Sequence, residues 1–435
     1  MNGILTWQGR LHDPVGGSSR GAVIRSRIQH FEENEKCTRY FFRKLFRSTT
    51  TINKLINEKG EEKCEEQQIL TEIYDYYKNL YRHQAAQEDE MVELLMKLTN
   101  KLTHTEKSRL DQEITINEIT EALISMKNNK TPGLDGLPKE FYTTFWESLK
   151  APLLQVYREA LSEEKLPNSM NQGMISLLYK KGEKTDLKNW RPLTLLGVDV
   201  KIIAKVLFFR LQTVITTIIG KEQTCGVKGR RMTDSLALIR DAILGIDLEK
   251  AFDSVNHEFL ERILDHLNFG ETFKRWIRTL YNECSSVAVV NGTITLPLAI
   301  KAGVRQGCPL SPLLFIIAIE PLACAIRENK MIKGITPPGN EGKDIKLTIY
   351  MDDLTLLLAD NVSISESLKI SEKFTKASGM KVNKQKSEIL YINWREIREN
   401  WGLIEKKDTI KHNSIINLIK SIKYLGFGDL KVMLP

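Results

Sequence analysis

The chain has 435 residues, of which 63 are lysine or arginine and 55 are aspartate or glutamate, so its formal net charge is +8. Its six cysteines stand singly, with no Cys-x-x-Cys pair and no histidine at zinc-ligand spacing, which excludes a zinc knuckle and indicates a reducing, intracellular compartment. Residues 1–14 lack the apolar core of a signal peptide, and the longest apolar run, Leu310 to Ile326, is interrupted by Glu320 and Pro321 and is too short to span a bilayer. We therefore expect no membrane-spanning segment, and the choice between nucleus and cytoplasm stays open.

The N-terminal quarter of the chain divides into two predicted segments. Residues 1–20 are rich in glycine and polar residues without periodicity, which predicts a disordered leader. Residues 21–110 are predicted to form a helical extension, because apolar side chains recur there at helical spacing: Ile69, Ile73, Tyr77 and Leu80.

Helix signals and basic residues dominate the next segment. Thr115-x-x-Glu118 is a capping box that predicts a helix ending at Asn128. Two further helices are predicted, from Val200 to Ile219 and from Asp234 to Ile243. Residues 178–231 contain twelve basic and four acidic residues, a pattern that suits contact with phosphate. A solvated basic face without a partner would have the same pattern.

The clearest chemical signal is Tyr350-Met351-Asp352-Asp353, which separates two runs of alternating apolar residues. This pattern predicts a β-hairpin with two adjacent carboxylates at its tip. Adjacent carboxylates repel each other unless a cation lies between them, and Mg²⁺ prefers oxygen ligands. Taken alone, the pair would fit an ordinary Asp-rich turn at least as well.

A third carboxylate, Asp247, follows the apolar residues Leu244 to Ile246, where we expect a buried strand to end. Three carboxylates at the ends of neighbouring strands could hold two Mg²⁺ ions about 4 Å apart, an arrangement that activates an attacking 3′-hydroxyl and stabilises a leaving pyrophosphate. On its own, Asp247 fits a turn-capping residue equally well.

Two later segments are rich in glycine and polar residues. Residues 302–312 predict a loop that brings backbone close to a large ligand before a helix capped by Ser311 begins at Pro312, although a plain helix lead-in fits the same residues. The second segment runs from Ser378 to Ser387.

Together these segments resemble the reverse transcriptases of non-LTR (LINE-type) retrotransposons. Their order and spacing are similar to palm motifs A to D, at residues 247–253, 303–312, 350–353 and 379–387. Lys130 to Pro138 resembles the fingers Gly-Asp-Gly motif, residues 175–181 and 189–194 resemble the dNTP-gripping hairpin, and residues 35–42 resemble the segment before the polymerase. Seven ordered motifs are far more specific than any one of them.

The resemblance implies an α+β right-hand polymerase fold. Fingers would occupy residues 111–231, a palm with an antiparallel sheet residues 232–390, and an incomplete thumb residues 391–435.

The resemblance also implies roles for individual residues. The catalytic metal site for two Mg²⁺ ions would be formed by Asp247, Asp352 and Asp353 with the backbone carbonyl of Leu248. The dNTP would be bound by Lys180, Arg191, Phe252, Gln306 and Gly307, with the Phe252 ring excluding a 2′-hydroxyl. Lys386 would protonate the leaving pyrophosphate, with Lys381 and Lys384 close by in sequence. By position alone, Phe252 would fit the core and both Lys180 and Arg191 would fit a charged surface.

The implied function is RNA-directed DNA synthesis by a monomer that binds an RNA template, a DNA primer and dNTPs. Two alternatives stay open. A catalytically inactive relic would only bind nucleic acid or protein, and a group II intron maturase would continue into a thumb and a basic domain. No segment resembles an endonuclease, and nothing after Tyr391 supplies a complete thumb or a Cys/His-rich tail, so self-sufficient target-primed insertion is not expected.

One segment departs from the family pattern. Only Leu244-Gly245-Ile246 separate the helix predicted to end at Ile243 from Asp247, and three extended residues reach about 10 Å. Either the helix end unwinds to serve as the strand, or the strand is partly missing and Asp247 is displaced. The contraction therefore predicts weak activity or none.

Overall fold

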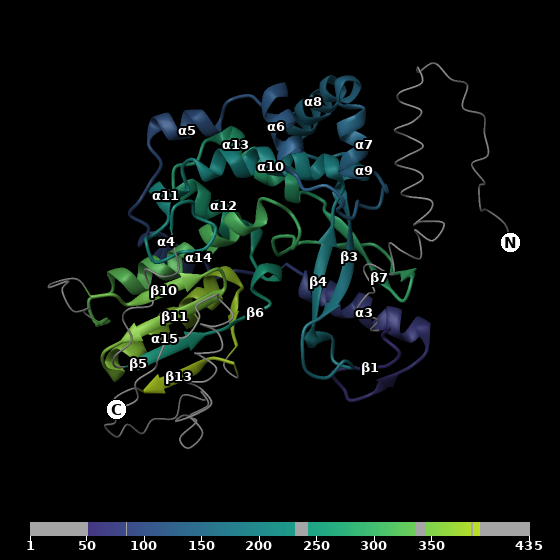
Figure 1. The fold of residues 1–435 in the computed structure, drawn as a ribbon. Helices are drawn as coiled ribbons and strands as arrows, with labels where there is room; N and C mark the ends of the chain where they lie inside the picture. The colour runs from purple at the N-terminus through teal and green to yellow at the C-terminus, as the bar shows by residue number, and fades with distance from the viewer. Residues whose placement is uncertain (1–50, 84, 231–241, 336–343, 384–385, 392–435) are drawn as a thin grey trace, which may run out of the picture.

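The computed structural model describes residues 51–83, 85–230, 242–335, 344–383 and 386–391. An antiparallel sheet lies at the lower left of Figure 1 and a mixed sheet at the lower right, with a layer of helices above both. This combination of helices with a separate antiparallel sheet confirms the predicted α+β class. The predicted leader at residues 1–20 and the thumb remnant beyond Tyr391 lie outside the described residues.

The described part of the N-terminal extension contains a short hairpin followed by three helices. These elements are β1 (Leu55–Ile56), β2 (Glu62–Lys63), α3 (Glu66–Leu80), α4 (Glu88–Leu95) and α5 (His104–Leu110). Helix α3 buries Ile69, Ile73 and Tyr77, as its helical spacing predicted, and it contacts the mixed sheet. Helix α4 packs instead against α15 (Asn361–Ser378), so the extension contacts distant parts of the chain.

The helical layer begins at the predicted capping box. The Thr115 hydroxyl accepts a hydrogen bond from the Glu118 N–H (3.3 Å), and the Glu118 carboxylate accepts one from the Thr115 N–H (2.9 Å). The helix that follows, α6 (Ile116–Ser125), ends before Asn128 because Met126 is extended. The layer continues with α7 (Lys139–Thr144), α8 (Trp146–Glu163), α9 (Asn168–Asn171), α10 (Val198–Gln212) and α11 (Ile215–Ile218). The single helix predicted over residues 200–219 is thus two helices.

The mixed sheet contains the predicted fingers hairpin. Strand β3 (Gln172–Tyr179) pairs antiparallel with β4 (Trp190–Leu195), and the 3₁₀ helix η1 (Leu187–Asn189) lies in their connection. On its other side, β3 pairs in parallel with β7 (Ser285–Val290), which pairs with β8 (Thr293–Ile294) and β9 (Leu298–Ala299). Since β7 comes from the residues assigned to the palm, the two expected domains share one sheet.

The antiparallel sheet has the strand order β10-β11-β5-β13. Its strands are β5 (Ala242–Ile246), β10 (Leu347–Tyr350), β11 (Asp353–Leu358) and β13 (Glu388–Tyr391). Helices α14 (Ser311–Glu328) and α15 pack against it and against each other. Beside the sheet, β6 (Leu248–Glu249) pairs with β12 (Lys381–Val382), and the 3₁₀ helix η3 (Ala251–Asp253) follows β6.

Two expectations about this region are wrong. The helix predicted to continue to Ile243 does not, because Ala242 and Ile243 belong to β5, which is hydrogen-bonded to β11 on one side and to β13 on the other. The strand before Asp247 therefore has five residues and not three, so the first of the two alternatives holds: the end of the predicted helix serves as the strand. The rest of that predicted helix, up to residue 241, lies outside the described residues. Ser311 is the first residue of α14 and not its cap, which is Leu310.

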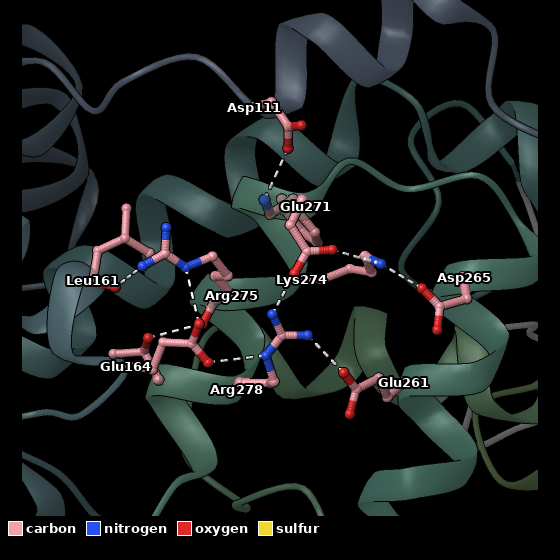
Figure 2. Close-up of polar contacts among 11 residues, drawn as sticks. Asp111, Leu161, Glu164, Glu261, Asp265, Glu271, Lys274, Arg275 and Arg278 are labelled. Carbon is pink, nitrogen blue, oxygen red and sulfur yellow. Dashed lines mark hydrogen bonds and ion pairs between the residues drawn. The ribbon is translucent and has the colours of Figure 1, made fainter.

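Helices α12 (His257–His266) and α13 (Glu271–Tyr281) are joined by a network of charged side chains. Figure 2 shows Arg278 between Glu164, Glu261 and Glu271, with Lys274 bound to Asp265 and Glu271. Asp111 accepts a hydrogen bond from the Phe273 N–H (2.8 Å) in the first turn of α13. This network ties α8, α12 and α13 into one support above the sheets.

None of the described helices is both long and apolar enough to cross a membrane. The cysteines within the described residues are free thiols: Cys64, Cys225, Cys284, Cys308 and Cys324.

Candidate active site

The predicted carboxylate hairpin is present between β10 and β11. Tyr350 pairs with Asp353, so Met351 and Asp352 form its two-residue turn. Met351 has a φ of 56°, which costs a non-glycine residue about 1–2 kcal/mol. Two contacts hold the turn in place: the Met351 N–H donates to Gln223 Oε1 (3.4 Å), and the end of the Met351 side chain packs next to Gly226. Such a held, strained turn is typical of a functional site.

Strand pairing brings Asp247 to the same edge as this hairpin. Leu354 lies opposite Ile246 in the antiparallel ladder, so Asp353 and Asp247 occupy the next position of the register. Burial raises the pKa of Asp353, and the carboxylates of Asp352 and Asp247 raise it further by repulsion. Burial also raises the pKa of Asp247, with Lys386 and Lys180 opposing the shift. Asp247 therefore interacts electrostatically with two adjacent carboxylates that lie more than a hundred residues further along the chain.

These carboxylates have the chemistry of a site for a hard divalent cation. None of the three accepts a hydrogen bond from a described residue or forms an ion pair with one, so their repulsion is uncompensated by direct contacts. Carboxylate oxygens are the ligands that Mg²⁺ prefers. Within the described ranges, however, no three acidic, histidine or cysteine side chains are close enough to hold one ion together. The donors fit the metal, but they do not form a closed cage.

Almost all the predicted site residues line one cavity of about 860 Å³. They are Lys180, Arg191, Asp247, Leu248, Phe252, Gln306, Gly307, Asp352 and Lys386, whereas Asp353, the first residue of β11, is not among the lining residues. Lys180 directly follows β3 and Arg191 lies in β4, and Lys180 is close enough to Asp247 to lower its pKa. The cavity lining thus combines cationic and acidic side chains, which suits a phosphorylated ligand whose reacting phosphate needs a metal ion.

The glycine-containing loop between residues 302 and 310 packs directly against η3 and against β4. Gly303 has a φ of 87°, and a Cβ there would lie 2.7 Å from the Asp253 carbonyl oxygen. Gly307 has a φ of 117°, and a Cβ there would collide with the Thr194 carbonyl oxygen. The Thr194 N–H donates to the Gln306 carbonyl (2.7 Å). Glycine is required at both positions because backbone approaches backbone.

Phe252 was expected either to pack in the core or to face a bound nucleotide, and it contacts both the core and the cavity. Its ring stacks on the buried ring of Phe315, with centroids 4.4 Å apart and an interplanar angle of 12°. It is only partly buried, because it also lines the cavity. A steric role toward a bound sugar and a packing role are therefore compatible.

Lys386 is held near Asp247 by the loop that carries it. The Asn383 N–H donates to the Asp247 carbonyl (2.8 Å), and the Asp247 N–H donates to the Ser387 hydroxyl (3.2 Å). Lys381, the alternative considered for its role, lies outside the cavity and lines a smaller neighbouring pocket. Lys384 falls outside the described residues.

Two cavity residues received no role from the sequence. Asp253 is 2% exposed, and burial raises its pKa to about 7 against the opposing effect of Lys250. The Lys250 ammonium donates to the carbonyls of Lys188 (3.2 Å) and Trp190 (3.1 Å), which links the loop after Asp247 to β4. One feature of the sequence could have indicated that Asp253 is buried: it directly follows Ala251 and Phe252, which pack in or against the hydrophobic core.

Comparison with known proteins decides the family. The model of the family described as reverse transcriptase (RNA-dependent DNA polymerase) matches residues 179–428, more than half of the chain. The chain belongs to the reverse transcriptase family. The chain is 35% identical, over 85% of its length, to a protein of transposon TX1 from Xenopus laevis. It is 27% identical, over 59% of its length, to a Pol polyprotein of the R2 retrotransposable element from Popillia japonica.

A third relative is a probable RNA-directed DNA polymerase from transposon BS of Drosophila melanogaster, with 23% identity over 63% of the chain. The predicted resemblance to LINE-type reverse transcriptases is therefore confirmed. The chain spans only 29%, 36% and 32% of the lengths of these three relatives.

Proposed function

We propose that this chain is an RNA-directed DNA polymerase of a LINE-type retrotransposon, extending the 3′-hydroxyl of a DNA primer with dNTPs along an RNA template. The observation that carries the proposal is the single cavity that Asp247 and Asp352 line together with Lys180 and Arg191. The family match supports the same activity.

In this proposal the basic and the acidic residues of the cavity have separate roles. Lys180 and Arg191 bind the triphosphate, since fixed cations suit phosphoryl oxygens. Asp247, Asp352, Asp353 and the Leu248 carbonyl hold two Mg²⁺ ions. Metal ions held by these residues would supply the charge needed to activate the 3′-hydroxyl and to stabilise the leaving pyrophosphate. Lys386, on the loop tied to the Asp247 backbone, is placed to donate a proton to that pyrophosphate.

Template and primer would be gripped without base-specific contacts, because a polymerase accepts any sequence. The proposed roles of Phe252 toward the sugar and of Gln306 and Gly307 toward the nascent base pair are supported by their position in the cavity lining. The proposed enzyme acts as a monomer.

The test is primer extension by the purified chain on poly(rA)/oligo(dT) with Mg²⁺. We expect extension by the wild-type chain and a loss of several orders of magnitude in Asp352→Asn, because the metal loses a charged ligand where phosphoryl charge develops. The matched control is Asp344→Asn, on an exposed segment outside the cavity. Equal rates for wild type and Asp352→Asn, whether measurable or absent, would contradict the proposal and favour an inactive nucleic-acid-binding relic.

A further inference from the structure

Asp253 connects two parts of the chain that are far apart in sequence. Tyr81, at the end of α3, donates its hydroxyl to Asp253 Oδ1 (3.2 Å), and Gln306 Nε2 donates to Asp253 Oδ2 (2.9 Å). Both contacts involve the lining of the cavity, because Asp253 and Gln306 are lining residues. The carboxylate thus uses one oxygen for the N-terminal extension and the other for the glycine-containing loop.

This pairing fixes which way the Gln306 amide points. Because Gln306 Nε2 donates to Asp253, the NH₂ group of Gln306 faces the carboxylate and its Oε1 faces away, an orientation that an ionised carboxylate enforces since it can only accept hydrogen bonds. Gln306 Oε1 accepts no hydrogen bond from a described residue. An oriented acceptor is therefore left for a ligand in the cavity.

The backbone around the pair is held in the same way from both sides. The Lys301 N–H donates to the Tyr81 carbonyl (3.0 Å), and the Val304 N–H donates to the Phe252 carbonyl (2.7 Å). The Tyr81 ring is stacked on Tyr77 of α3, with centroids 6.0 Å apart. The loop that carries Gln306 is consequently attached to α3 at two points, one through backbone and one through side chains.

The arrangement is unfavourable as a purely structural device. Asp253 is almost fully buried, and a buried carboxylate loses the hydration of its charge unless its partners replace it. Its described hydrogen-bond donors are two neutral groups, so an amide of the same shape would fill the site at lower cost to folding. A positioning role accounts for a charge at this place.

We propose that Tyr81 and Asp253 are positioning residues that hold the Gln306 amide in one orientation toward the nucleotide, so that the N-terminal helix α3 contributes to dNTP binding. This inference rests on the proposed polymerase function. It assigns a role to the extension that lies ahead of the matched family region, residues 179–428.

The test measures dNTP binding without chemistry. A dideoxy-terminated primer on an RNA template prevents bond formation, and the dNTP complementary to the next template base raises the thermal unfolding midpoint according to its affinity. We expect Tyr81→Phe and Asp253→Asn each to weaken dNTP binding by about threefold to tenfold, the effect of one hydrogen bond. Binding of template and primer should not change.

Two further variants separate positioning from general damage. Asp253→Asn combined with Gln306→Ala should be no weaker in dNTP binding than Gln306→Ala alone, because Tyr81 and Asp253 act on the nucleotide only through Gln306. We call this hydrogen-bonded series, from Tyr81 through Asp253 to Gln306, the relay. Tyr157→Phe is the matched control, since it also removes a fully buried hydroxyl with one hydrogen bond, to the Asp199 carbonyl (2.7 Å), away from the cavity. It should leave dNTP affinity unchanged.

The outcomes distinguish this inference from the proposed function. If the wild-type chain extends primers and binds dNTP but Tyr81→Phe and Asp253→Asn bind it equally well, the relay is wrong and the polymerase stands. Additive losses in the double variant would also overturn the relay. If the wild-type chain neither extends primers nor gains stability from dNTP, the proposed function fails, and the inference fails with it.

Discussion

Ile246 lies directly opposite Leu354 in the antiparallel sheet, and this single register places Asp247 beside Asp353. The two aspartates are separated by more than a hundred residues in sequence. Asp247 directly follows Ile246, and Asp353 directly precedes Leu354. Because side chains alternate along a strand, a shift of one residue in β5 would turn its side chains to the opposite face. The length and register of β5 are therefore as important as the carboxylates themselves.

Inserting a loop and a strand from an intact relative between Ile243 and Leu244 is expected to abolish or strongly reduce polymerase activity. If the strand before Asp247 had only three residues, this insertion would restore the missing part. The insertion point lies inside the five-residue strand β5, however, so the insertion would disrupt a complete strand. Displacing Asp247 by roughly 1 Å can cost about 10²-fold in rate. Primer extension by the inserted and unmodified chains, compared at equal folded concentration, checks this. Faster extension by the inserted chain would restore the contracted-strand explanation.

Phe252→Val is expected to raise ribonucleotide incorporation relative to deoxynucleotide incorporation by about tenfold or more, because a smaller side chain opens space at the cavity wall. The measurement is the ratio of kcat/KM for a dNTP and its ribonucleotide. Phe315→Leu is the control, since it removes the stacking partner of Phe252 without facing solvent. That control should lower stability and leave the ratio unchanged. An unmoved ratio in Phe252→Val would assign Phe252 to packing alone.

Lys180→Ala is expected to raise the apparent KM for dNTP by about tenfold to a hundredfold, the effect of losing a charge-assisted hydrogen bond to phosphate. Affinity for template and primer should change much less, because one triphosphate loses its contact and the duplex does not. Lys184→Ala is the matched control: Lys184 lies on the same hairpin over the Tyr179 ring but outside the cavity. An equal loss of dNTP and duplex binding would indicate a general basic surface.

Asp253→Asn is expected to raise thermal stability more at pH 8 than at pH 5. Burial raises the pKa of Asp253 to about 7, against the opposing effects of Lys250, Tyr81, Gln306 and Arg191. An acid whose folded pKa lies above its unfolded value favours the folded state at low pH, and this contribution is lost as the pH rises through about 7. The amide carries no charge and avoids the loss. Thermal unfolding at both pH values measures the difference, and an equal shift at pH 5 and pH 8 would show that Asp253 is not titrating there.

Glu271→Gln is expected to lower stability at neutral pH slightly, by no more than about 1 kcal/mol, because Glu271 is 61% exposed and its ion pairs are screened. Hydrogen bonds from Lys274 and Arg278 lower the pKa of Glu271 to about 2. Stability from this group is therefore complete above about pH 4.5 and is lost as the pH falls toward 2. Urea unfolding at pH 7 and pH 3 should show a smaller difference between variant and wild type at pH 3. Figure 2 shows the contacts that the substitution weakens.

Local sequence determined the parts of this protein that depend on near neighbours. The capping box at Thr115 and the hairpin of β10 and β11 form where the pattern predicted them, although the turn is Met351–Asp352 and Asp353 already belongs to β11. Each is fixed by hydrogen bonds or side-chain alternation within a few residues, so that composition and spacing suffice. The family resemblance carried the same information further, to the residues that line the cavity.

Tertiary structure decided what local pattern left ambiguous. Residues 242–246 form a short apolar run that fits a helix end or a buried strand, and only pairing with β11 and β13 selects the strand. In the same way, Asp253 had no evident role until the fold placed it against Tyr81, 172 residues away, and Gln306, 53 residues away. The physical reason is common to both cases: hydrogen bonds between distant segments depend on how the chain packs, and a short stretch of sequence carries no record of its partners.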